Sequence, residues 1–171
     1  DVKVVDEKGN TLPTGEVGEL WIFGPNVVKE YWNKPEATAE TFTDGWLHSG
    51  DLARIDEEGF IYILDRAKDM LIRGGENVYC VEVEDALYSH DDVMDAAVIG
   101  IPHKVLGEEV GAVIQVTPGS SVTEGDLQTY VRQHLAAFKV PVKIELRTEP
   151  LPRNANGKIL KRQLREEWGL V

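Results

Sequence analysis

Apolar positions follow one pattern in the first 65 residues and a different pattern after them. In the first part, short apolar clusters alternate with polar turn signals, which is typical of β-hairpins; these clusters lie at 2–5, 18–23, 52–55 and 60–64. One short helix is expected at 34–42, because Pro35 occupies its first turn. Residues 1–65 are therefore predicted to form a small, incomplete β-rich unit.

Helical spacing characterises the second part. The clearest helix is predicted at 123–135, where Thr123 is a good N-cap and apolar or aromatic residues recur every three or four positions. Further helices are predicted at 81–89 and 160–168, and strands at 93–99, 110–116 and 143–146. This order predicts an α+β fold class: an incomplete β-rich N-terminal segment, part of a larger barrel subdomain, followed by a small α+β domain with a three-stranded sheet and helices.

The chain is acidic but carries a basic strip near its end. It has 30 acidic and 18 basic residues, a net charge of −12, which argues against nucleic acid as a partner because phosphate backbones select basic surfaces. Residues 139–165, the basic strip, reverse this balance with eight basic residues and two acidic ones. The strip fits either a polyphosphate ligand or an ordinary solvated surface, and charge alone leaves both open.

Cysteine and histidine usage predicts neither a disulfide nor a metal site. Cys80 is the single cysteine, which is typical of a reducing compartment, so a cytoplasmic location is expected. Its valine-rich surroundings predict a small packed residue rather than a nucleophile. No run of 18 apolar residues occurs, so no transmembrane segment is expected. The histidines are dispersed without metal-ligand or triad spacing: His48, His90, His103 and His134.

Four segments carry motifs that stand out from this background. The last is Asn154–Lys158, in which the dipeptide Asn156-Gly157 predicts a tight turn, because both residues tolerate positive φ, and Lys158 follows directly. A lysine presented in this way is suited to meeting a phosphate or carboxylate; a solvated lysine on a surface turn is the alternative. The other segments are Gly18–Trp32, Asp44–Leu52 and Leu64–Tyr79.

In this order, the four segments resemble those of the adenylate-forming superfamily, which includes acyl- and aryl-CoA synthetases, luciferases and peptide-synthetase adenylation domains. The sequences of Gly74–Tyr79 and Asn154–Lys158 are most similar to those of fatty-acyl and related acyl-CoA ligases. The resemblance covers almost the whole chain. It implies an AMP-forming acid–thiol ligase, which joins a carboxylic acid to CoA through an acyl-adenylate at the expense of ATP.

The resemblance also implies roles for three polar side chains. Lys158 is then catalytic, because it stabilises charge spread over the carboxylate, the α-phosphate and the leaving pyrophosphate. Asp51 holds the ribose of ATP or AMP, and Arg66 contacts the ribose or a phosphate. Without the resemblance, Asp51 reads as a turn-forming aspartate before a strand, and Arg66 as a surface partner of Asp65.

The resemblance implies roles in interdomain movement and in CoA binding for three further residues. Lys68 matches the family's interdomain hinge, where backbone freedom matters more than charge. Gly74 and Gly75 match a loop that lines the pantetheine channel of CoA in the second reaction; a plain hairpin turn is the alternative. The chain is thereby divided into residues 1–65, the end of the large N-terminal domain, and 66–171, the mobile C-terminal domain.

Other parts of such an enzyme do not occur in this sequence. A Gly-, Ser- and Thr-rich phosphate loop and a Tyr-Gly-x-Thr-Glu segment are both absent, so the chain is expected to be a C-terminal fragment that is inactive alone. ATP, CoA and Mg²⁺ are the expected ligands, with the Mg²⁺ ligands and the acyl pocket in the missing N-terminal part, which is the expected partner. The alternatives are an adenylation domain acting on a carrier protein and a non-catalytic α+β interaction module.

Overall fold

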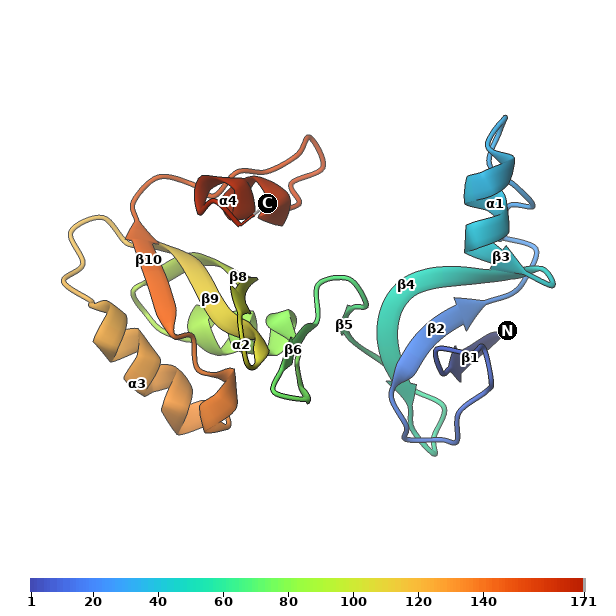
Figure 1. The fold of residues 1–171 in the computed structure, drawn as a ribbon, viewed down its shortest axis with the longest axis horizontal. Helices are drawn as coiled ribbons and strands as arrows, with labels where there is room; N and C mark the ends of the chain where they lie inside the picture. Colours follow the sequence, from blue (N-terminus) through green and yellow to red (C-terminus); the bar gives the residue numbers. More distant parts are fainter. Residues whose placement is uncertain (171) are drawn as a thin grey trace. The chain divides into compact units, whose positions relative to one another are not determined.

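The chain forms two units, residues 1–68 and 69–171, in the computed structural model, which describes residues 1–170 (Figure 1). The expected boundary lay between residues 65 and 66. Strand β5, Ile61–Arg66, runs through that point and pairs Arg66 with Asp51 of the first unit. The division therefore falls in the turn that follows β5. The roles of the two units within a larger enzyme stay predictions.

The first unit is a five-stranded antiparallel sheet with one helix, and this confirms the predicted β-rich segment. The strand order is β1-β2-β4-β3, and β5 also pairs with β4. Pro35 is the first residue of the helix, where a backbone N–H would have no intrahelical partner. The elements are β1 Val2–Val5, β2 Gly18–Ile22, α1 Pro35–Thr41, β3 Phe42–Thr43, β4 Trp46–Ile55 and β5 Ile61–Arg66.

Strand β4 is longer than the apolar pattern predicted, and this changes the setting of Asp51. The apolar cluster at 52–55 marks only the end of β4, which begins at Trp46. The first residues of β4 pair with β2 and β3, and its last residues pair with β5, so backbone pairing extends the strand through a polar stretch. Asp51 therefore lies within a strand, and the interpretation as a turn residue before a strand is wrong.

The second unit confirms the predicted α+β class and has a mixed five-stranded sheet of order β10-β9-β6-β7, with β8 on β9. Strands β8 and β9 are antiparallel, and β10 is parallel to β9. The three predicted strands are β8, β9 and β10. The predicted count of three strands is wrong, because β6 and β7 join the sheet as the hairpin that was the alternative for Gly74 and Gly75; the apolar pattern did not show these strands, since each has three residues. The elements are β6 Leu71–Arg73, β7 Glu76–Val78, α2 Cys80–Tyr88, β8 Val93–His103, β9 Gly107–Val116, α3 Glu124–His134, a 3₁₀ turn Ala137–Lys139, β10 Lys143–Arg147 and α4 Lys161–Glu167.

Helix α3 begins where the sequence predicted, because its first turn is capped from both sides. The Thr123 hydroxyl accepts a hydrogen bond from the Asp126 backbone N–H at 3.2 Å, and the Thr123 N–H donates to the Asp126 carboxylate at 2.9 Å. Leu127 and Val131 are buried on the face that packs into the core. His134, also on the predicted apolar face, is exposed at the end of the helix.

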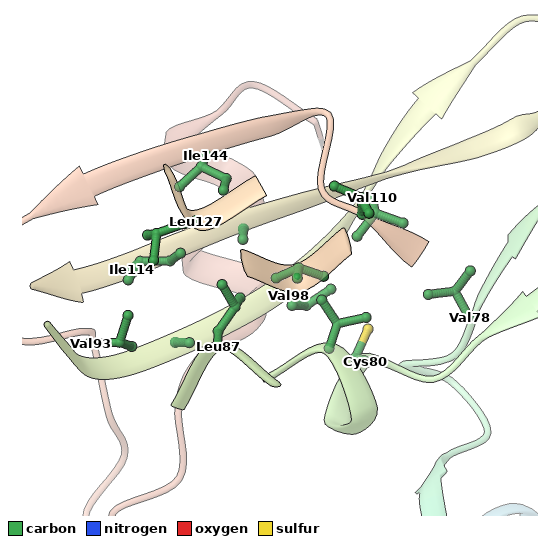
Figure 2. Close-up of a cluster of buried hydrophobic side chains, with 14 of the residues drawn as sticks. Val78, Cys80, Leu87, Val93, Val98, Val110, Ile114, Leu127 and Ile144 are labelled. Atoms are coloured by element: carbon green, nitrogen blue, oxygen red, sulfur yellow. The ribbon is translucent and has the colours of Figure 1, made fainter. Parts of the chain in front are cut away.

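The main core of the second unit lies between the sheet and helices α2 and α3 (Figure 2). Leu87 from α2 and Leu127 from α3 meet Val98 of β8 and Ile114 of β9, and all four side chains are fully buried. Cys80 belongs to the same cluster, which confirms its prediction as a packed residue. Each fully buried aliphatic side chain of this size contributes about 1.5–3 kcal/mol relative to exposure.

A second, smaller cluster covers the opposite face of the same strands. Because side chains alternate along a strand, Ala97 and Ile99 of β8 point away from the main core. They pack with Leu151 and with Leu164 of α4, both of which are buried. These two leucines fix the ends of the segment between them, which contains Lys158.

We expect Leu127→Ala to lower the free energy of unfolding by about 2–5 kcal/mol, because it leaves a cavity at a fully buried position in the main core. Gln133→Ala, on the exposed side of the same helix, is the control and should change stability by less than about 0.5 kcal/mol. Urea unfolding of both variants checks this, and equal midpoints would contradict the assignment of α3 to the core.

Candidate functional site

The first unit brings two of the predicted site residues together. Asp51 of β4 and Arg66 of β5 are direct cross-strand partners. The Arg66 Nε donates to the Asp51 carboxylate over a long distance, 3.4 Å, and both side chains are partly exposed. The pair thus offers a carboxylate and a planar cationic donor side by side at the surface, and these are groups that can bind a ribose hydroxyl and a phosphate.

The backbone before Asp51 is held by residues to which the sequence analysis gave no role. Gly50 has a φ of +72°, which favours glycine, and its N–H donates to the Glu19 carboxylate at 3.1 Å. The second oxygen of that carboxylate accepts from the Trp21 indole N–H at 2.9 Å. The signal in the sequence was an acidic residue inside an apolar strand, at Glu19.

Lys68, the predicted hinge residue, is the last residue of the first unit. It lies in the turn after β5 and is exposed. The preceding residue, Ala67, donates its backbone N–H to the Gly50 carbonyl at 2.9 Å. Backbone pairing to the first unit therefore continues as far as Ala67, and Lys68 stands at the junction of the two units.

Gly74 and Gly75 form the turn of the β6–β7 hairpin. Their φ values are +61° and +89°, and two positive φ values between paired strand residues define a type I′ turn. The hairpin reading is thus correct as a description of local structure. Outside its chain neighbours, no atom lies within 4 Å of where a Cβ would sit at Gly75, so the backbone there is open to the approach of a ligand. The role in CoA binding stays a prediction.

The turn that carries Lys158 is held by its own hydrogen bonds. The Asn154 carbonyl accepts from the Gly157 N–H at 2.9 Å, and the Asn154 N–H donates to the Lys158 carbonyl at 2.9 Å. The side-chain oxygen of Asn154 also accepts from the N–H groups of Asn156 and Lys158, at 3.0 and 2.9 Å. Of the predicted Asn-Gly pair, only Gly157 has a positive φ, +80°. The Asn154 side chain takes over part of the turn.

Most cations of the basic strip are neutralised within the second unit, and Lys158 is not. Lys158 is exposed and forms no ion pair within residues 1–170. The interpretation of the whole strip as a ligand surface is therefore too broad. Five of its basic residues have acidic partners, and these pairs are Lys139–Glu82, Arg147–Glu145 and Glu167, Arg153–Asp95, Lys161–Glu84 and Arg162–Glu166.

Lys161, three residues after Lys158, illustrates the difference. Its ammonium lies 2.8 Å from the Glu84 carboxylate and fixes the start of α4 against α2. Burial alone would lower the pKa of Lys161, but the neighbouring Cys80 and Glu84 outweigh this effect, and the pKa is raised above its ordinary value. Lys161 is therefore a charged structural residue, whereas the Lys158 ammonium faces solvent.

The histidines are not assembled into a site. His48 stacks on Trp21 with ring centroids 4.0 Å apart, and its Nε2 lies 3.0 Å from the Thr43 hydroxyl. Within residues 1–170, no group of three or more His, Cys, Asp or Glu side chains is arranged to hold a metal ion.

The second unit matches a known family. Residues 82–158 match the AMP-binding enzyme C-terminal domain, a span that ends at Lys158. The match covers a little less than half of the chain, and in this span the chain is similar to that family. The matched span includes most of α2, all of α3, strands β8, β9 and β10, and the Lys158 turn.

Relatives extend the similarity to both units. A feruloyl-CoA synthase from an Amycolatopsis species is 46% identical over 99% of this chain and 34% of its own length. The fatty acid–[acyl-carrier-protein] ligase ScoC from Streptomyces coeruleorubidus is 44% identical over 98% of this chain and 32% of its own length. The solved structure of ATP-bound MatB from Rhodopseudomonas palustris superposes with a TM-score of 0.90 at 41% identity, covering 98% of this chain and 34% of that one. The chain spans about a third of the length of these relatives. The predicted resemblance to the C-terminal portion of an adenylate-forming enzyme is confirmed.

Proposed function

We propose that the full-length protein containing this chain is an AMP-forming acyl-CoA synthetase. A carboxylate oxygen attacks the α-phosphorus of ATP and pyrophosphate leaves, giving an acyl-adenylate. The thiol of CoA then attacks the acyl carbon, loses its proton, and AMP leaves. The observation that carries this proposal is the presentation of Lys158, an unpaired ammonium among residues 1–170 on a hydrogen-bonded turn within the family-matched segment.

Lys158 acts in the first of these two reactions. Negative charge spreads over the attacking carboxylate, the α-phosphate and the leaving pyrophosphate, and a compact ammonium on a flexible stem can bridge two of these groups. Because Lys158 has no acidic partner among the described residues, its charge is available to the substrates. Losing one such charge-stabilising group typically costs about 10²–10³ in rate.

Asp51 and Arg66 bind the nucleotide. The Asp51 carboxylate accepts hydrogen bonds from the ribose hydroxyls, and Arg66 contacts the ribose or a phosphate. Their mutual contact of 3.4 Å is long, so a ribose can share the carboxylate without displacing a strong ion pair. ATP binding is supported by the similarity to ATP-bound MatB. Mg²⁺ accompanies ATP, and we expect its protein ligands in the part of the full-length protein that lies outside this chain.

The two reactions use different faces of the second unit. The β6–β7 hairpin, with Gly74 and Gly75 at its turn, and the loop before α4, with Lys158, lie well apart on that unit (Figure 1). When the second unit rotates about Lys68, the Lys158 turn leaves the nucleotide and the glycine turn takes its place. The glycine turn then contacts the pantetheine arm of CoA. The N-terminal part of the full-length enzyme is the partner that completes the site.

The thiol acceptor has one competitor. The similarity to ScoC, named as a ligase for an acyl carrier protein, is almost as high as that to feruloyl-CoA synthase. A carrier-protein pantetheine and CoA present the same thiol, so the same glycine turn serves either acceptor.

No helix in the described part of the chain is long and apolar enough to cross a membrane, and a cytoplasmic location stays a prediction.

We expect the full-length protein to catalyse ATP–pyrophosphate exchange that depends on added carboxylic acid, tested with aromatic and fatty acids. It should then form AMP and a thioester with free CoA faster than with a pantetheinylated carrier protein. Faster transfer to the carrier would favour the competing function. Absence of exchange with every acid in the panel, in a folded protein, would favour a non-catalytic interaction module.

We expect Lys158→Ala in the full-length protein to slow adenylate formation by about 10²–10³, because a charge-stabilising group is lost. Thioester formation from a supplied acyl-adenylate should stay near normal, since the glycine turn then occupies the site. Lys158→Arg should also fail, because a guanidinium is wider and planar. Arg162→Ala removes an exposed cation of the same segment and is the control. A normal rate of adenylation by the alanine variant would show that Lys158 is a solvated surface residue without a catalytic role.

We expect Lys68→Pro to leave adenylate formation largely intact and to slow thioester formation strongly. Proline fixes φ near −65° and restricts Ala67, so rotation at the junction is hindered. Lys68→Ala removes the charge but keeps backbone freedom, and both of its half-reactions should remain near normal. Single-turnover assays of each half-reaction measure the difference. Equal losses in the two half-reactions of the proline variant would remove the case for a hinge.

A further inference from the structure

A buried carboxylate in the sheet is linked to the turn that carries Lys158. Asp95 of β8 is 6% exposed and is one of two buried charged residues among residues 1–170. One of its oxygens accepts a hydrogen bond from the Tyr88 hydroxyl. The same oxygen accepts a second one, of 3.0 Å, from the Ala96 N–H. The other accepts from the Arg153 guanidinium at 2.5 Å. A carboxylate is costly to bury unless it is paired and hydrogen-bonded, and this one is fully compensated by these three donors.

Arg153 reaches from this carboxylate to the turn. While one terminal nitrogen of its guanidinium binds Asp95, the other donates to the backbone carbonyl of Gly157. The hydrogen bond to Asp95 is the main cause that raises the pKa of Arg153, which stays charged. Gly157 directly precedes Lys158. A rigid, planar fork thus joins a buried strand residue to the peptide that presents the candidate catalytic ammonium.

The turn needs an external tie because its other hydrogen bonds are internal. The loop closes on itself through the bridge between Arg153 and Ile159 and through the bond from the Leu160 N–H to the Pro152 carbonyl, 2.8 Å. These bonds define the shape of the loop but not its angle to the sheet. Ile159 packs against the second cluster at the end of the loop, but residues 153–158 are all exposed, so the tip itself has no apolar packing. The guanidinium is the side chain that connects this tip directly to the sheet.

We propose that Asp95 and Arg153 are positioning residues that hold the Gly157–Lys158 peptide in a fixed orientation on the second unit. The inference rests on the proposed function of Lys158 in adenylate formation. An untied turn lets the ammonium sample positions away from the reacting carboxylate and α-phosphate. A misplacement of about 1 Å can cost about 10²-fold in rate even when no reacting group is removed.

The test variant is Arg153→Lys, which keeps a positive charge beside Asp95 but cannot reach both the carboxylate and the Gly157 carbonyl. We expect the Gly157 and Lys158 amides to exchange hydrogen at least about tenfold faster in the 171-residue chain. In the full-length protein we expect adenylate formation to fall by about 10–10²-fold, with thioester formation from a supplied acyl-adenylate unchanged. Arg162→Lys, an exposed conservative change in the same segment, is the matched control and should alter none of these.

A second variant tests the other end of the link. Asp95→Asn keeps the shape of the side chain and removes its charge, so it should produce the same half-reaction pattern if it folds. The double variant Asp95→Asn/Arg153→Lys should then lose little more than either single change, because residues that act through one interaction are not additive. Additive losses would show two independent effects and would overturn the link.

Three results would overturn the inference. The first is wild-type amide exchange in Arg153→Lys, and the second is faster exchange with normal adenylation. The third is an equal loss in both half-reactions, which indicates general destabilisation. The exchange measurement does not depend on activity. If the wild-type full-length protein forms no acyl-adenylate, the proposed function fails, while exchange in the chain still decides whether Arg153 holds the turn.

Discussion

The burial of strands β8 and β9 on both faces is the constraint on which the second unit depends. Along β8, Val98 faces the core under α2 and α3, whereas Ala97 and Ile99 face the cluster under α4. A shift of one residue in register would exchange these faces and place the wrong side chains in each core. Both candidate functional turns are attached to this strand pair, the glycine turn through the pair Arg73–Gly107 and the Lys158 turn through Leu164.

Most basic residues near the end of the second unit form ion pairs within that unit, and Lys158 differs from them because it is unpaired. Arg153 and Lys161 on either side of Lys158 are each committed to a carboxylate of low exposure, on β8 and on α2. These pairs fix the segment to the domain by charge as well as by packing. An exposed ammonium between two anchored cations is therefore presented by a framework that limits where it can go, and pre-organised charge of this kind stabilises developing negative charge efficiently.

Local structure could be predicted where its causes are local. Helix α3 was predicted in place because Thr123 and Asp126 satisfy each other's first-turn groups three residues apart. The turn before Lys158 was predicted from the dipeptide Asn156-Gly157, although only Gly157 takes a positive φ and the side chain of Asn154, which had no role in the prediction, completes the turn. The β6–β7 hairpin was expected only as an alternative, from its Gly74-Gly75 turn, since its three-residue strands carry too few alternating positions to show a period.

The partners of charged side chains were decided only by the tertiary structure. Asp51 and Arg66 lie 15 residues apart in the sequence, and their contact depends on the register of β4 against β5. Asp95 and Arg153 lie 58 residues apart, and their contact depends on packing of the final segment against β8. Periodicity, caps and turn residues determine what each segment is, because they act over a few residues. Strand register and packing between distant segments decide which basic side chains form ion pairs and which remain free to contact a ligand. Neither can be derived from composition or local sequence patterns.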